Sequence, residues 1–143
     1  MIGKSDISYP IRIRKTALVM LGFSVFTFVF HKVYAHYSHG VDSASMQSMY
    51  LTLLVLGAIF YSVLGFIKPD ITRLSGYRGF TNLYNMGLAT VVTGQLIQGI
   101  VEVAGTGSKY IRFYYVVGTT AMCLGIFVLL LSFVIECKQI KSE

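Results

Sequence analysis

Four long stretches without charged residues constrain the fold of this chain more than any other feature. Asp, Glu, Lys and Arg are absent from residues 16–31, 43–67, 79–101 and 113–135. A membrane-spanning helix needs about 20 apolar residues to cross a hydrocarbon core of about 30 Å. The last three stretches reach that length alone. The first reaches it when Val33 and Tyr34 are added and Lys32 extends its amine toward the headgroups.

These stretches predict an all-α fold, a four-helix transmembrane bundle with spans near 14–36, 46–68, 81–104 and 110–136. The composition agrees, because 55% of the 143 residues are hydrophobic and 13% are charged, against about 25% charged residues in a soluble domain. This balance excludes an ordinary soluble domain, a disordered chain and a disulfide scaffold. The connections are short, so residues 1–143 are expected to form a single integral membrane domain.

Lys and Arg are distributed unequally between the two ends of the predicted spans. Nine lie in the N-terminal segment, the second connection and the C-terminal tail: Lys4, Arg12, Arg14, Lys15, Lys68, Arg73, Arg78, Lys138 and Lys141. The other two connections hold three: Lys32, Lys109 and Arg112. Cytoplasmic segments carry the excess of Lys and Arg, so both termini of this cell-membrane protein are expected in the cytoplasm. No nucleic-acid partner is expected, because the basic residues have no folded platform.

The first span also imitates a secretory signal peptide. A basic segment at residues 11–15 precedes an apolar run to Phe30, and Val33-Tyr34-Ala35 resembles a cleavage site with small residues. Cleavage there would leave three spans. Lys32 and the bulky Tyr34 disfavour cleavage, so an uncleaved first helix is the preferred interpretation.

The spans are expected to form two helical hairpins that repeat each other. In the first and third connections a Gly, at 40 or 105, is followed by a Ser, at 43 or 108. The Gly can end one helix in the left-handed conformation, and the Ser can cap the next. Both hairpins would start on the same side of the membrane, so the predicted repeat axis runs along the membrane normal.

Small residues predict close helix packing in the last two spans. Glycines lie within these spans at positions 87, 94, 118 and 125, and small residues let helix backbones approach closely in lipid. Tyrosines near the predicted span ends, Tyr84 and Tyr110 among them, are interpreted as an aromatic belt at the headgroups.

The third span carries the most polar face. Gln95, Gln98 and Glu102 follow each other at spacings of three and four, which places them on one side of a helix. Amides in lipid need partners, so this face is expected to point into the bundle. The residues predict either an interhelical hydrogen-bond ladder or a polar pocket. Because the two outer loops share one design, His39 is expected to approach Glu102.

The three histidines are clustered in the sequence. His31, His36 and His39 lie within nine residues, and Asp42 follows three residues later. Imidazole and carboxylate groups are ligands of borderline metals, so this set is a candidate metal site. Ordinary histidines at the membrane interface are the competing interpretation. Haem is disfavoured because two axial histidines usually come from different helices.

Two segments resemble motifs of a group of uncharacterised small four-span membrane proteins from Gram-positive bacteria. One is residues 37–46, Tyr-Ser-His-Gly-Val-Asp-Ser-Ala-Ser-Met, and the other is residues 100–110, Ile-Val-Glu-Val-Ala-Gly-Thr-Gly-Ser-Lys-Tyr. The resemblance implies a multi-pass membrane protein and no particular activity. The chain does not resemble small multidrug transporters, which carry a Glu in the first span and a Trp later.

Three classes of function follow from these features. The preferred class is an accessory or structural membrane subunit that packs with itself or with a partner protein in the bilayer. The second is a small dimeric transporter or channel that uses the polar face of the third span. The third is a metal- or haem-handling redox protein. The sequence contains no catalytic motif, so neither an enzyme nor a bound cofactor is expected.

Overall fold

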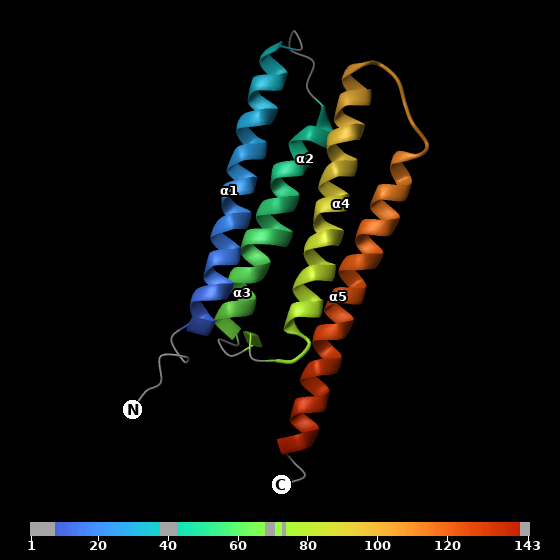
Figure 1. The fold of residues 1–143 in the computed structure, drawn as a ribbon. Helices are drawn as coiled ribbons and strands as arrows, with labels where there is room; N and C mark the ends of the chain where they lie inside the picture. The colour runs from blue at the N-terminus through green and yellow to red at the C-terminus, as the bar shows by residue number, and fades with distance from the viewer. Residues whose placement is uncertain (1–7, 38–42, 68–70, 73, 141–143) are drawn as a thin grey trace.

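The computed structural model describes residues 8–37, 43–67, 71–72 and 74–140. Its elements are α1 (Ser8–Tyr37), α2 (Ala44–Thr52), the π-helix η1 (Leu53–Ile59), α3 (Phe60–Ile67), α4 (Tyr77–Val103) and α5 (Ile111–Ile140). α2, η1 and α3 follow one another without a break and form one continuous helix, here called span two (Figure 1). The described residues form helices and turns and contain no strand.

Within the described residues, four helices are long and apolar enough to cross a membrane: Arg12–Tyr37, Ala44–Ile67, Tyr77–Val103 and Ile111–Lys138. They lie over the four stretches predicted from the sequence. In an 18-residue apolar segment of each helix, between 17% and 33% is buried within the molecule. Most of the apolar surface of the helices therefore faces outward. Such surface is stable in lipid and not in water, which supports a multi-pass membrane protein.

The four spans form an open row in chain order (Figure 1). α1 packs against span two, span two packs against α4, and α4 packs against α5. Within the described residues, no Cα atom of α1 lies within 8 Å of one in α4 or α5. The four predicted helices are therefore confirmed, and they lie in a row in which each described span packs against its neighbour along the chain. Lipid tails are as apolar as the helix surfaces, so no hydrophobic free energy drives the row to close.

The most tightly buried part of the row is an aromatic cluster between span two and α4. Phe60 stacks on Tyr84 with ring centroids 4.7 Å apart, and Tyr61 meets Tyr84 edge-on at 5.8 Å. The Tyr84 hydroxyl donates a 2.7 Å hydrogen bond to the Leu56 carbonyl in η1. Tyr84 is thus a core residue and not a member of an interfacial belt. Tyr110, by contrast, is exposed.

Glycines set the contact between α4 and α5. Gly87, Gly94, Gly118 and Gly125 are all buried, as the small-residue pattern predicted. A Cβ added at Gly94 would lie 2.7 Å from Tyr114 Cβ, and one at Gly125 would lie 3.0 Å from the Tyr84 nitrogen. The two helix backbones can approach this closely only because these positions lack a side chain.

The connections agree with the predicted turns in part. Gly105 has a φ of 70°, and Ser43 caps α2 by accepting a 3.2 Å hydrogen bond from the Met46 amide. Ser108 is not the cap of α5: its hydroxyl accepts from the Tyr110 amide at 3.4 Å, and the helix begins only at Ile111. Gly40 lies outside the described residues.

Candidate functional site

The Glu102 carboxylate is the centre of a polar network at the end of the row where α2 begins and α4 ends. Ser43 Oγ donates to Glu102 Oε2 and Ser45 Oγ donates to Glu102 Oε1, each at 2.6 Å. The Ser45 backbone contributes a further hydrogen bond. Charge-assisted bonds of this length are among the stronger polar contacts in proteins. The first turn of span two is therefore attached to the last turn of α4.

The local sequence explains why the carboxylate lies there. Amides in the first turn of a helix have no intrahelical partner and carry a partial positive charge, so the start of α2 attracts an anion. Gly99, one turn before Glu102, lets α2 come close, because a Cβ at Gly99 would overlap Met46 Cγ and lie 3.1 Å from Ser43 Oγ. Both Ser43 and Met46 are buried.

Gln98 extends the network to α5. Its amide nitrogen donates to Glu102 Oε1 at 3.0 Å, and its carbonyl oxygen accepts from the Tyr115 hydroxyl at 2.7 Å. One continuous chain of hydrogen bonds thus connects span two, α4 and α5. Each atom of the Gln98 amide and of the Glu102 carboxylate has a protein partner.

A cleft of about 690 Å³ lies beside this network, between the end of α4 and the start of α5. Gln98, Glu102 and Tyr115 line one side. Lys109 and Arg112 bring two cations to the same cleft, and both side chains are exposed. The cleft is open to the surroundings and carries both signs of charge.

Gln95 is separate from the Glu102 network. Its amide nitrogen donates a 2.8 Å hydrogen bond to Thr52 Oγ1 on span two, and only 7% of the residue is exposed. Among the described residues its Oε1 atom has no hydrogen-bond partner. The predicted polar face therefore divides into two parts. Gln95 bonds to span two alone, whereas Gln98 and Glu102 are hydrogen-bonded to each other.

The structure separates the two described histidines. His31 is 5% exposed and lies on the face of α1 that also carries the buried Ser24 and Thr27, whereas His36 is exposed. Within the part of the chain that the structure describes, no group of three or more His, Cys, Asp or Glu side chains could hold a metal ion. His39 and Asp42 lie outside that part, so the metal site and the approach of His39 to Glu102 stay predictions.

Sequence reasoning missed the partners of Glu102. Ser43 was predicted only as a helix cap, and the bonds of Ser45 to Glu102 and of Tyr115 to Gln98 were not predicted. One signal was present: in neighbouring antiparallel helices, the start of the second span and the end of the third lie at the same end. The Ser-Ala-Ser opening at residues 43–45 was therefore bound to lie near the depth of Glu102.

No known protein family, curated protein or solved structure matches this chain.

Proposed function

We propose that the protein is an accessory or structural membrane subunit that acts by packing its helices against a second copy or another membrane protein. The observation that supports this role best is the pairing of polar side chains within the spans. Several of them form hydrogen bonds to the neighbouring span, as Gln95 does to Thr52. A subunit of this kind needs no enzymatic chemistry and no cofactor.

The pairs connect neighbouring spans at several depths. Near the α4 start, the Tyr61 hydroxyl donates to Asn85 Oδ1 at 2.8 Å. Nearer the other end, Gln95 binds Thr52. Between α1 and span two, Ser24 Oγ donates to the Tyr50 carbonyl at 2.9 Å. Interhelical hydrogen bonds of this kind hold helices together in lipid.

The two edges of the row supply the surface for a partner. α1 and α5 each pack against one neighbour. Large apolar side chains are exposed on both, such as Phe26 at 64% and Val134 at 61%. The proposal includes the finer topology: two hairpins in the cell membrane, with both termini in the cytoplasm, as the distribution of Lys and Arg favours.

Cysteine cross-linking in the native membrane tests the role. In a background of Cys123→Ser and Cys137→Ser, Phe26→Cys is expected to form a cross-linked species larger than one 15.9 kDa chain at native expression. Ser24→Cys is the matched control: it lies two residues away, is 4% exposed and faces span two, so it should not react. If scanned positions on both edges give only single chains, the subunit role is wrong.

The cleft beside Glu102 favours a second candidate, a small transporter or channel. It brings Lys109, Arg112 and the Glu102 carboxylate to one opening, as a binding site for a small polar solute would. Flux of labelled solutes into proteoliposomes tests this function. Glu102→Gln should abolish any flux if the cleft transports, and should lower thermal stability with no effect on flux if the network is only structural.

A further inference from the structure

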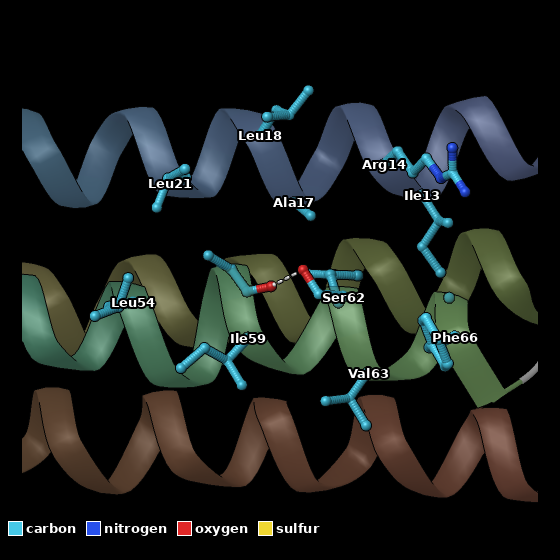
Figure 2. A pocket seen from close by; sticks show the side chains of 13 residues that line it. Ile13, Arg14, Ala17, Leu18, Leu21, Leu54, Ile59, Ser62, Val63 and Phe66 are labelled. Carbon is cyan, nitrogen blue, oxygen red and sulfur yellow. Dashed lines mark hydrogen bonds between the residues drawn. The ribbon is translucent and has the colours of Figure 1, made fainter.

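An apolar groove runs between α1 and span two. It lies toward the start of α1 and the end of span two, whereas the Glu102 network lies at the opposite end of the helices. The groove has a volume of about 620 Å³. Figure 2 shows its walls, with Leu21 and Leu54 near one end and Arg14 and Phe66 near the other. Leu18 and Phe66 are 65% and 93% exposed, so the groove opens to the surroundings of the helices.

Few polar groups line this groove, and some of them already have hydrogen-bond partners within the protein. Ser62 Oγ donates to the Ala58 carbonyl at 2.7 Å and is satisfied within its own helix (Figure 2). The Tyr61 hydroxyl is used by Asn85. The Arg14 guanidinium is the charged group of the lining, at the end of the span. Arg12 and Lys15 lie beside it on α1, and neither α1 nor span two contains an Asp or Glu.

The dimensions of the groove match one leaflet of a bilayer. Leu54 and Phe66 are 12 residues apart on span two, which is at most about 18 Å at the α-helical rise of 1.5 Å per residue, because the π-helical part rises less. Half of a hydrocarbon core is about 15 Å. A groove that starts at an interfacial arginine and ends near the bilayer centre has the length and polarity profile of one lipid chain with its headgroup.

We propose that this groove binds an anionic phospholipid, with one acyl chain between α1 and span two and the phosphate on Arg14. Arg forms bidentate hydrogen bonds with phosphate oxygens, and the neighbouring Arg12 and Lys15 add long-range attraction. The occupant is a lipid and not a helix of a second copy, because the lining is apolar along its length and carries its charged group, Arg14, only at the end of the span. The inference does not depend on the subunit role.

Native mass spectrometry of the full chain tests the headgroup contact. The protein is released from nanodiscs of equal parts phosphatidylglycerol and phosphatidylcholine, and the ratio of the two lipids retained is measured. Wild type is expected to retain phosphatidylglycerol preferentially. Arg14→Gln should lower that ratio about fivefold, and Arg14→Lys should lower it less. Arg78→Gln is the matched control, because it removes an exposed charge at the same end of the row and should leave the ratio unchanged.

A second pair of variants tests the acyl chain. Ser62→Phe fills the groove and should reduce the number of lipids retained. Thr120→Phe is its control: Thr120 is also exposed and also bonds the carbonyl four residues before it, at 2.7 Å, but it lies on α5 away from the groove. If Arg14→Gln and Arg78→Gln lower the lipid ratio equally, the anionic lipid is attracted by the total positive charge and not by this groove, which would overturn the proposal. Full lipid retention in Ser62→Phe would overturn it too. So would a peak at the mass of two chains that is present in wild type and absent in Ser62→Phe, because a second copy would then occupy the groove.

Discussion

Gly87 of α4 and Gly118 of α5 bring their backbones into direct contact. A Cβ on Gly87 would lie 2.5 Å from the Gly118 carbonyl oxygen, and a Cβ on Gly118 would lie 2.8 Å from the Gly87 carbonyl oxygen. The approach is reciprocal, and the obstructing atoms are backbone atoms that no rotamer change can move. These two glycines therefore fix both the distance and the register of the last two spans.

Gly87→Ala should destabilise the protein by about 2–3 kcal/mol, because the added methyl overpacks a backbone contact. Gly22→Ala is the control. Gly22 is also within a span, but nothing lies within 4 Å of its added Cβ, so Ala should be neutral or stabilising by up to about 1 kcal/mol. Unfolding in mixed micelles measures both. Equal stability of the two variants would contradict the close α4–α5 contact.

The Ser43–Glu102 hydrogen bond should show energetic coupling. Ser43→Ala removes both the cap of α2 and a donor to Glu102, and we expect a loss of about 1–2 kcal/mol. Glu102→Gln should cost about 1 kcal/mol. In a double-mutant cycle the two losses should add to more than the loss in the double variant, because the Ser43–Glu102 bond can be lost only once. Strict additivity would show that the bond contributes nothing to stability.

Thr52 and Gln95 should respond asymmetrically to substitution. Thr52→Val leaves the buried Gln95 amide without its acceptor, which should cost about 1–3 kcal/mol. Gln95→Leu removes the amide and its unsatisfied oxygen together, so we expect a smaller loss. Adding Gln95→Leu to Thr52→Val should restore part of the stability. The measurement is again unfolding in mixed micelles, and a double variant less stable than Thr52→Val is the contrary result.

Tyr84→Phe should destabilise the contact between α4 and η1 by about 1 kcal/mol, because the Leu56 carbonyl loses its 2.7 Å hydrogen bond. Tyr110→Phe removes the same hydroxyl from a side chain that is 77% exposed and should change the melting temperature little. If the two substitutions have equal effects, Tyr84 does not hold the π-helical segment.

Labelling with a membrane-impermeant maleimide tests the topology. In a Cys123→Ser background, Cys137 near the end of α5 should stay unlabelled on intact cells and react after permeabilisation. Thr106→Cys, in the connection between α4 and α5, should react on intact cells, because that connection carries few of the basic residues that stay in the cytoplasm. The reverse pattern would place the termini outside.

The sequence alone determined the number and position of the spans. Charge-free length depends only on the order of residues, and helices in lipid satisfy their backbone groups one segment at a time. The same independence explains why Gly87 and Gly118 could be recognised as contact positions and Gln95 as a group that needs a partner. These are properties of single helices.

Tertiary structure alone decided which helices meet and which groups pair. Spacing placed Gln95, Gln98 and Glu102 on one face, but it could not show that Gln95 binds Thr52 while Glu102 binds Ser43. Nor could it show that Tyr84 lies in the core or that α1 and α5 stay apart. In lipid all apolar faces are nearly equivalent, so helix neighbours are selected by close backbone packing and by a few hydrogen bonds between spans. Those contacts join residues as much as 59 positions apart, and their geometry exists only once the helices lie side by side.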